Sequence, residues 1–471
     1  MSCRLERPGH TVTGQMIRRM PSSSSKLPPG PPGRFLFGNA LELSRNWMDF
    51  LVDCARKYGD AFFSNFFNAP ICLLAHPDYI EHVLVTNQSN FVKSRDYRVL
   101  SHVMGEGLLT AEGETWRRQR KLVQPVFHHE NLVKYGKVML DCATRMLDSW
   151  EDGAVRDIHK DMVHLTLEIV TRALFGTTVL DRAGDVVPGL QSMMEEFTRH
   201  ANLSFILPEF VPLPVRCRLR RSIKVLDDVF YSIIRSRRIA SSDQNDLLDA
   251  LFKMRLPDGH PMSDRELRDE MMTLLLTGHE TTAVALSWTW YPVAQNKQTK
   301  TKLDGELNKV LGDREPTVGD IPRLRYTECV IKESMRSYPP AWRIGRGALA
   351  DFEVGGYRLP AEANVFPMQW ITHRDERFYP EPERFRPERW DEAVHGNDLP
   401  RFAYFPFGGG PRKCIGASFA MMEAVLLLAA FARKVRLDLS QGAHAELLPS
   451  LALRPRFGLR MIVHKRNHRV P

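Results

Sequence analysis

The chain has 471 residues, 43% of them hydrophobic, which is enough for a sizeable core in one large domain or several smaller ones. Its formal net charge of +9 permits acidic partners without identifying one, and we expect no nucleic-acid partner. Seven scattered cysteines without a C-x-x-C pair argue against a disulfide framework, a structural zinc and an iron-sulfur cluster, and indicate a reducing compartment, the cytoplasm. The longest apolar stretch, 424–432, is shorter than the roughly 20 residues that a transmembrane helix needs, so we expect no transmembrane segment.

The first 26 residues are rich in arginine and serine and contain Glu6 as their single acidic residue. This composition predicts a disordered tail over 1–26. A transit peptide or a twin-arginine signal is disfavoured, because the apolar or amphipathic segment that such signals need does not follow. The next stretch, "LPPGPPG" at 27–33, cannot be helical, and we predict that a single catalytic domain over 27–471 begins there.

Helical periodicity dominates the rest of the chain, and strand-like runs are short. The runs "AFFSNFF", "ICLLAH" and "FEVGGYRLP" are the strand candidates, and Pro292 predicts a kink or an early end in the longest helix. This pattern predicts a mainly α protein with small β-sheets and excludes a doubly wound nucleotide-binding fold. The predicted helices cover 47–58, 131–150, 161–175, 190–198, 220–239, 246–254, 263–295, 326–337 and 417–433.

One segment, "FPFGGGPRKCIG" at 405–416, which we call the Cys loop, places a lone thiol behind three glycines and two cations. Lys413 occupies the third glycine position of G-x-G-x-x-G, so the loop is not a dinucleotide fingerprint. A thiol just before a helix meets exposed N–H groups that lower its pKa, and thiolate is the form that binds iron. The glycines would admit a flat ligand, Phe407 would shield the sulfur and Arg412 suits a carboxylate. The alternative is a buried structural cysteine in a glycine-rich turn.

The loop resembles the haem-ligand signature of the cytochrome P-450 family, F-x-x-G-x-R-x-C-x-G. The resemblance extends over nearly the whole chain, from about Leu27 to the region of Val463. It implies haem b with Cys414 as the axial iron ligand, between a long oxygen-binding helix and the helix that follows the loop. The matching residues are Phe407, Gly410, Arg412, Cys414 and Gly416.

A second stretch, "LLLTGHETTA" at 274–283, resembles the oxygen-binding helix of that family, [AG]-G-x-[DE]-T-[TS]. The resemblance implies that Thr281 hydrogen-bonds bound oxygen, that Glu280 feeds protons inward and that the mid-helix glycine leaves room for O2. For the threonines alone, hydroxyls that bond back to the preceding turn are the simpler explanation. Gly278, Glu280, Thr281 and Thr282 match the pattern, whereas Thr277 stands where the family has alanine or glycine.

Two further groups of residues match the family. Glu333 and Arg336 form an E-x-x-R pair on one helix face, and Arg384 is the expected third member of a structural ion network that supports the haem pocket. The second group would bind the haem propionates, although surface helix charges are the alternative for any one of its members. Its members are Trp116, Arg120, Arg343 and Arg412.

The resemblance implies a monooxygenase that inserts one oxygen atom of O2 into an apolar, lipid-like or terpenoid-like molecule. Its pocket walls are expected at 91–109 and 197–215, and the latter lid region could touch a membrane surface. Electrons from NAD(P)H would come through a small acidic ferredoxin or flavodoxin with its reductase, docked near Arg412 and Lys413 on a monomer. A peroxygenase, an oxygen-independent rearrangement and a haem-thiolate sensor are the alternatives, and Glu280 with Thr281 disfavours them.

Overall fold

The computed structural model describes residues 27–33, 38–66, 69–176, 190, 193, 214–240, 246–253, 259–391 and 399–466. The tail predicted at 1–26, nearly all of the helix predicted at 190–198 and most of the lid segment 197–215 lie outside these residues. The proline-rich stretch 27–33 is not helical, as predicted, and the N–H of Phe63 donates a 2.8 Å hydrogen bond to the carbonyl of Pro29.

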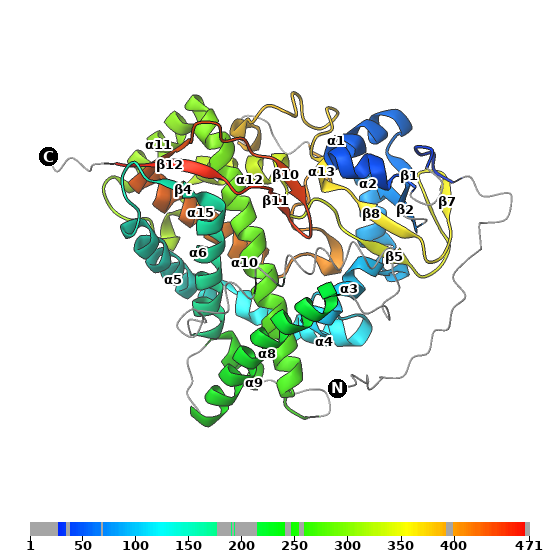
Figure 1. Ribbon diagram of the computed structural model, residues 1–471, viewed down its shortest axis with the longest axis horizontal. Helices are drawn as coiled ribbons and strands as arrows, with labels where there is room; N and C mark the ends of the chain where they lie inside the picture. The colour runs from blue at the N-terminus through cyan, green and yellow to red at the C-terminus, as the bar shows by residue number, and fades with distance from the viewer. Residues whose placement is uncertain are drawn as a thin grey trace.

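The described chain is mainly α-helical with small sheets, in agreement with the predicted fold class (Figure 1). Helices α5, α6, α11 and α15 lie on one side of α10, and the five-stranded sheet lies on the other side together with α1 and α2. Most of the predicted helices are found, whereas five helices, α2, α3, α4, α11 and α13, lie outside the predicted ranges. The helices are α1 (Ala40–Tyr58), α2 (Pro77–Glu81), α3 (Arg95–Met104), α4 (Gly113–Val123), α5 (His129–Asp148), α6 (Ile158–Phe175), α8 (Pro214–Ala240), α9 (Leu247–Lys253), α10 (Asp264–Gln295), α11 (Lys297–Leu311), α12 (Arg325–Ser337), α13 (Gln369–Thr372) and α15 (Ala417–Lys434).

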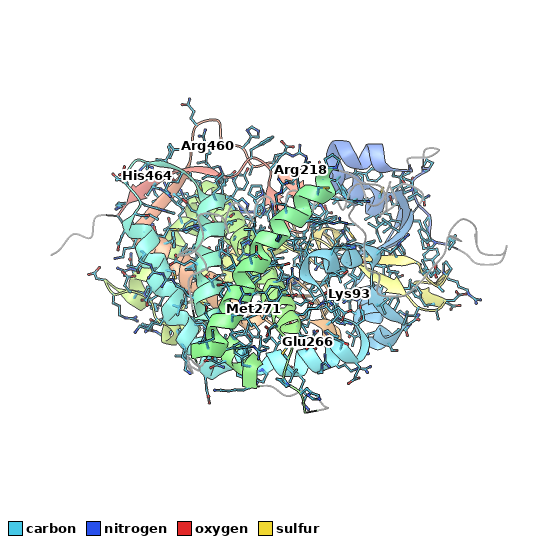
Figure 2. All side chains as sticks on the ribbon, turned by 60° about the horizontal axis from the view of Figure 1, so that its bottom comes forward. Lys93, Arg218, Glu266, Met271, Arg460 and His464 are labelled. Atoms are coloured by element: carbon cyan, nitrogen blue, oxygen red, sulfur yellow. The ribbon has the colours of Figure 1, made fainter. Side chains whose placement is uncertain are left out.

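Helix α10 begins at the predicted capping box. The hydroxyl of Ser263 accepts a hydrogen bond from the N–H of Glu266, whose carboxylate accepts one from the N–H of Ser263. Figure 2 labels Glu266 in this first turn and Met271 farther along the same helix. Pro292 lies in the last turn and the helix ends at Gln295, which confirms an end close to the proline.

The strands of the described ranges form four small sheets. The largest has the order β1-β2-β8-β5-β3, in which β2 and β8 are parallel and the other pairs are antiparallel. A three-stranded sheet, β4-β12-β9, joins a strand in the first half of the chain to two strands near the C-terminus, and the strand candidate "FEVGGYRLP" forms a hairpin of β6 and β7. The strands are β1 (Ala61–Phe66), β2 (Ala69–Leu74), β3 (Phe91–Lys93), β4 (Val155–Asp157), β5 (Arg346–Ala348), β6 (Phe352–Val354), β7 (Tyr357–Leu359), β8 (Asn364–Pro367), β9 (Val435–Leu439), β10 (Leu447–Pro449), β11 (Leu453–Pro455) and β12 (Arg460–Lys465).

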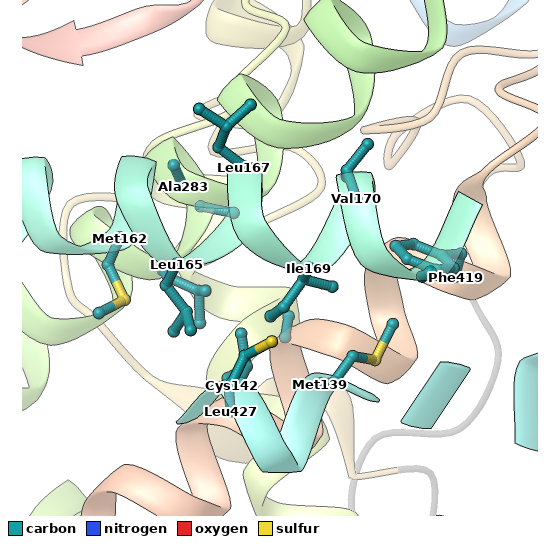
Figure 3. Close-up of a cluster of buried hydrophobic side chains, with 14 of the residues drawn as sticks. Met139, Cys142, Met162, Leu165, Leu167, Ile169, Val170, Ala283, Phe419 and Leu427 are labelled. Carbon is teal, nitrogen blue, oxygen red and sulfur yellow. The ribbon is translucent and has the colours of Figure 1, made fainter. Parts of the chain in front are cut away.

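The largest hydrophobic core lies where α5, α6, α10 and α15 meet. Figure 3 shows Leu165 and Ile169 of α6 facing Met139 and Cys142 of α5, with Leu427 of α15 beside them. All five side chains are buried, and this packing fixes α5, α6 and α15 relative to one another. Because the Cys loop leads directly into α15, the core also fixes where Cys414 lies.

None of the helices in the described ranges is long and apolar enough to cross a membrane.

Candidate active site

Backbone hydrogen bonds fold the Cys loop into a compact turn ahead of α15. The N–H of Gly408 donates to the carbonyl of Phe405 over 2.9 Å, and the N–H of Cys414 donates to the carbonyl of Phe407 over the same distance. Gly416 is the N-cap of α15, which begins at Ala417 as predicted. The side chain of Cys414 therefore lies at the N-terminal end of this helix.

The thiol of Cys414 is accessible to solvent, although protein atoms surround it on most sides. This surrounding protein raises the pKa of Cys414, while the N–H of Gly416 and the charges of Arg120 and Lys413 lower it by a smaller amount. The sequence-based expectation of a net lowered pKa is therefore wrong for the thiol alone, because desolvation outweighs the helix end. The three opposing groups nevertheless favour thiolate, which is the form that a bound metal ion selects.

The Cys-loop glycines do not all serve to admit a ligand. Gly410 has φ +66°, and a Cβ there would lie 1.9 Å from the carbonyl oxygen of Leu84. This glycine is required by the close contact between the Cys loop and the turn at 82–86. Phe407 is half-buried against the main core and does not face solvent freely.

Arg412 is held by protein groups on α4 and the residues before it. Its guanidinium donates to the carbonyl of Ala111 over 2.8 Å, forms an ion pair with Glu112 and stacks over the ring of Trp116 at 4.1 Å. Burial lowers the pKa of Arg412 to about 10, Glu112 opposes this shift and Arg346 adds to it. The structure thus gives Arg412 a carboxylate partner within the chain, which the sequence reasoning did not foresee.

Arg120 joins α4 to the Cys loop, since its guanidinium donates to the carbonyl of Lys413 over 2.7 Å. Arg343, by contrast, lies over the rings of Trp342 and Phe366. Arg346, which the sequence reasoning missed, is buried and close enough to Arg412 to lower its pKa. Its only signal in the sequence is that it follows Arg343 by three residues.

The hydroxyls of α10 bond back along the helix. Thr277 donates to the carbonyl of Thr273 over 2.7 Å, and Thr281 donates to the carbonyl of Thr277 over 2.9 Å. Thr282 donates weakly to the carbonyl of Gly278 over 3.3 Å. Thr281 is exposed although residues on both sides of it in the chain are buried, so its hydroxyl faces an opening at the middle of a buried helix.

Helix packing explains why a glycine stands at position 278, and the sequence did not reveal this. A Cβ at this position would lie 3.2 Å from Cγ2 of Val170, because α6 runs close against α10 there. The hydroxyl of Thr166 on α6 also donates to the carbonyl of His279 over 2.9 Å. The glycine therefore allows the two helices to approach, whether or not it also leaves room for O2.

Helix α15 meets α10 at Thr282, beside which the carboxyl group of Glu423 is fully buried. Burial raises the pKa of Glu423 well above its usual range, and the nearby hydroxyl of Thr282 lowers it by less. Neither carboxyl oxygen has a hydrogen bond of good geometry within the described residues. This contact joins Thr282 of α10 to the second turn of α15.

The predicted ion network is present with one correction. The carboxylate of Glu333 accepts two 2.9 Å hydrogen bonds from Arg336, and both side chains are fully buried. The third member of the network is Arg389, whose guanidinium lies 3.0 Å from the Glu333 carboxylate, and not Arg384, whose side chain is 64% exposed beside Glu381. The stretch 384–390 contains three arginines, and spacing alone did not distinguish the one that the backbone turns inward.

These residues fit a haem with a thiolate ligand. Cys414 is an accessible thiol that receives an N–H bond and lies near the charge of Arg120, while an indole and a buried cation surround Arg412, as a site for propionates requires. The exposed hydroxyl of Thr281 projects from the helix that packs against α15. The cationic group consists of Trp116, Arg120, Arg346 and Arg412.

Comparisons with known proteins identify the family of the chain. The cytochrome P-450 family model matches residues 28–456. Cyclooctatin synthase of Streptomyces melanosporofaciens is 34% identical over 426 residues, which cover 90% of this chain and 92% of that protein. A cytochrome P-450 of Mycobacterium bovis is 35% identical over 83% of this chain and 87% of its own length. Cyclooctat-9-en-7-ol 5-monooxygenase of Streptomyces melanosporofaciens is 31% identical over 88% of this chain and 92% of its own length. The chain therefore belongs to the cytochrome P-450 family and is a haem-dependent monooxygenase.

Proposed function

We propose that this enzyme inserts one oxygen atom of O2 into an apolar, terpenoid-like small molecule, with haem b held by Cys414. The observation that supports it best is the accessible thiol at the start of α15, bonded by the N–H of Gly416 and flanked by cations. When bound, a thiolate-ligated haem supplies the chemistry that cleaves the O–O bond. The protein residues then have three tasks, which are to hold the propionates, to deliver protons and to orient an apolar substrate.

For the propionates we propose Trp116, Arg120, Arg412 and Arg346. Arg346 replaces Arg343, because it is buried near Arg412 while Arg343 lies over aromatic rings. Arg412 can share its five N–H donors between Glu112 and a propionate. A second anion beside two buried arginines would also reduce their mutual repulsion.

For proton delivery we propose Thr281 and Glu280. The hydroxyl of Thr281 is exposed at the middle of α10 and can both donate and accept a hydrogen bond. Glu280 is the neighbouring carboxyl group and is buried. Thr277 donates its hydroxyl to its own helix, so it adds bulk to the wall without a free donor there.

The substrate class rests on two relatives and on the pocket wall. The name of one relative specifies a monooxygenase of cyclooctat-9-en-7-ol, and another is a cyclooctatin synthase. In the wall predicted at 91–109, Leu100, Val103 and Leu108 are buried and apolar, which favours a hydrocarbon-like ligand. The second predicted wall, 197–215, lies almost entirely outside the described residues.

For electron transfer we propose a small acidic ferredoxin or flavodoxin, with its reductase, on the face formed by α4 and the Cys loop. A hollow of about 350 Å³ there is lined by Trp116, Arg117, Arg120, Lys121, Gln124, Pro125 and His128. Lys413 is exposed beside it, and Arg120 connects the two elements. The cations lie next to Cys414, so a partner bound there would be close to the metal. We further propose a monomer in a reducing compartment such as the cytoplasm, which the six free cysteines among the described residues support.

The test of the haem ligand and the reaction uses the purified holoenzyme with a reconstituted reductase system. We expect the ferrous carbon monoxide complex to have the long-wavelength Soret band of thiolate ligation, and a panel of cyclic terpenoids to yield singly oxygenated products. The Cys414→Ser variant should lose both the long-wavelength Soret band and the oxygenated products. A Soret band like that of a histidine-ligated haem in undamaged wild-type protein would disprove the assignment.

The docking test reverses charges on the proposed face. Lys413→Glu and Lys121→Glu should lower the rate at which an acidic ferredoxin reduces the enzyme. The rate that remains should depend less on salt concentration. Lys309→Glu on the exposed side of α11 is the control of equal charge change. If all three variants were reduced at the wild-type rate at every salt concentration, the partner would bind elsewhere.

A further inference from the structure

The proposed propionate site already contains a carboxylate of the protein. Glu112, the N-cap residue of α4, forms an ion pair with the guanidinium of Arg412, which also donates to the carbonyl of Ala111 over 2.8 Å. The side chain of Arg412 is 16% exposed and that of Glu112 is 36% exposed, so the pair is partly desolvated. A carboxylate in a site that has to receive two further carboxylates opposes their binding, so a structural or functional gain has to offset that cost.

Glu112 is held at both of its carboxylate oxygens. One oxygen faces Arg412, and the other accepts a 2.7 Å hydrogen bond from the backbone N–H of Lys93 at the end of β3. The side chain cannot turn away without breaking both bonds. Glu112 therefore joins three segments of the chain, which are the end of β3, the start of α4 and the Cys loop.

The surroundings of Arg412 show what this carboxylate does. The guanidinium stacks over the ring of Trp116 at 4.1 Å, and the buried Arg346 lies close to it. Arg346 of β5 is paired in the sheet with Lys93, the residue whose N–H holds Glu112. Burial lowers the pKa of Arg412, Arg346 lowers it further and Glu112 opposes both. Glu112 is thus the anion that lets two arginines lie close together before any ligand is bound.

We propose that Glu112 is a positioning residue, which holds Arg412 in the propionate site, and that its negative charge lowers the reduction potential of the bound haem. The three arginines of the cationic group stand against three carboxylates, Glu112 and the two propionates, so these charges cancel. Without Glu112 one positive charge would remain and would favour the added electron. That electron comes from the proposed redox partner or, in the test below, from dithionite. This inference rests on the proposed function, because it needs a haem whose propionates lie at Arg412.

The alternative is an ion pair that only stabilises the contact between α4 and the Cys loop. Such a pair would affect unfolding and leave the reduction potential of the folded holoenzyme unchanged. Two conservative variants separate position from charge. Glu112→Gln keeps an oxygen acceptor for Arg412 and Lys93 and loses the charge, whereas Glu112→Asp keeps the charge and shortens the reach of the side chain.

The experiment compares Glu112→Gln and Glu112→Asp with the wild-type holoenzyme. The first readout is the midpoint potential, measured without substrate by anaerobic titration with dithionite and redox dyes. The second readout is the rate at which haem is lost to an excess of apomyoglobin, and neither readout needs turnover. The matched control is Glu114→Gln, two residues farther along the chain, which removes the same charge from a side chain that is 84% exposed beside Arg117.

Glu112→Gln should raise the midpoint potential, so that the ratio of ferrous to ferric protein at a fixed solution potential increases by roughly two- to tenfold. Most of this shift should persist at high salt, because partly buried charges are screened less than exposed ones. The same variant should retain haem at least as well as the wild type. Glu112→Asp should keep a potential near that of the wild type and lose haem about tenfold faster, since it cannot satisfy Arg412 and Lys93 together. Glu114→Gln should match the wild type in both readouts.

A midpoint potential in Glu112→Gln equal to or below that of the wild type would overturn the inference and leave a structural ion pair. An equally large shift in Glu114→Gln would also overturn it, because the potential would then follow net charge alone. Should Glu112→Gln not retain haem, Glu112→Ser, which can still cap α4, takes its place with the same readouts. Failure of the proposed function would appear in the carbon monoxide spectrum of the wild-type enzyme, so the two failures are separable.

Discussion

The backbone N–H of Phe405, the first residue of the Cys loop, donates a 3.1 Å hydrogen bond to Nε2 of His373. His373 is fully buried, and the carbonyl of the same residue accepts from Arg336 over 2.8 Å. Burial, and then the charges of Arg336 and Arg374, hold the pKa of His373 well below its usual range, so its ring is a neutral acceptor. The backbone and the side chain of one residue, His373, thus connect the Glu333 ion network to the loop that carries Cys414.

We expect His373→Leu to destabilise the protein by about 1 to 3 kcal/mol, because the buried N–H of Phe405 loses its acceptor. His373→Gln retains a hydrogen-bond acceptor and should lose less stability than His373→Leu. The measurements are the free energy of unfolding in denaturant and the fraction of thiolate-type carbon monoxide spectrum. His444→Leu, at an exposed histidine, is the control. A His373→Leu variant as stable as wild type would mean that the loop does not depend on this bond.

Arg389 and Arg384 offer a matched pair of substitutions. Arg389→Met removes a hydrogen bond to the buried charge of Glu333 and should cost about 1.5 to 3 kcal/mol of stability, together with weaker haem retention. Arg384→Met breaks an exposed ion pair with Glu381 and should change stability by less than about 0.5 kcal/mol. Thermal unfolding of both holoenzymes decides the assignment, and a reversed order would restore Arg384 to the network.

The assignment of Arg384 in place of Arg389 shows which features the sequence could predict and which it could not. Cys414, its loop and α10 were predicted because their signals are local, such as the capping box at Ser263 or glycines at fixed distances from a thiol. The choice among the arginines at 384–390 depends on which side chain the 3-10 turn Pro387–Trp390 directs at Glu333, about 50 residues earlier in the chain. Long-range geometry of this kind leaves no trace in residue spacing.

Helix α11 was missed although its signals are local, since the buried Leu303, Leu307 and Leu311 recur every four residues and Asn296 accepts a hydrogen bond from the N–H of Thr299 at its start. Long-range pairing explains the other misses. Strand β12 pairs with β4, which lies some 300 residues away in the sequence. The bonds of Arg412 to Glu112 and of Glu280 to Arg454 also join distant segments, so motif matching found one partner of each pair only.

Gly410→Ala should be far more harmful than Gly442→Ala, although both glycines have positive φ, +66° and +73°. The backbone strain costs roughly 1 to 2 kcal/mol at either position. Only at Gly410 would the added methyl also collide with the carbonyl of Leu84, whereas nothing lies within 4 Å at Gly442. Denaturant unfolding and haem content measure the difference. Equal effects would show that the Cys loop can shift away from residue 84.

Glu270 on α10 predicts a pH dependence of stability. Its carboxyl group is fully buried, accepts a 3.2 Å hydrogen bond from the N–H of Leu108, and burial raises its pKa from 4.5 to about 8. Between these values the folded state binds more protons than the unfolded state, so stability falls as pH rises, by at most about 1.4 kcal/mol per pH unit. Above pH 8 this contribution is flat.

Glu270→Gln should remove that slope, which is measured as the difference between the variant and wild-type unfolding free energies from pH 5 to 8. Glu114→Gln, at a side chain that is 84% exposed, is the control and should leave the slope unchanged. A difference that grows in favour of wild type with rising pH would have the opposite sign and would mean that Glu270 is ionised in the folded protein.

Thr281→Ala tests the exposed hydroxyl at the middle of α10. The variant loses a group that can hold a proton beside the haem site, while the helix loses only a bond back to the carbonyl of Thr277. We therefore expect product formed per NAD(P)H consumed to fall by roughly tenfold, with NAD(P)H consumption and stability little changed. Thr301→Ala removes a hydroxyl with the same type of back-bond, to the carbonyl of Lys297, on exposed α11, and should behave like wild type. If coupling in Thr281→Ala matched that of Thr301→Ala, the hydroxyl would be a helix back-bond alone, and proton delivery would have to reach the site through another group.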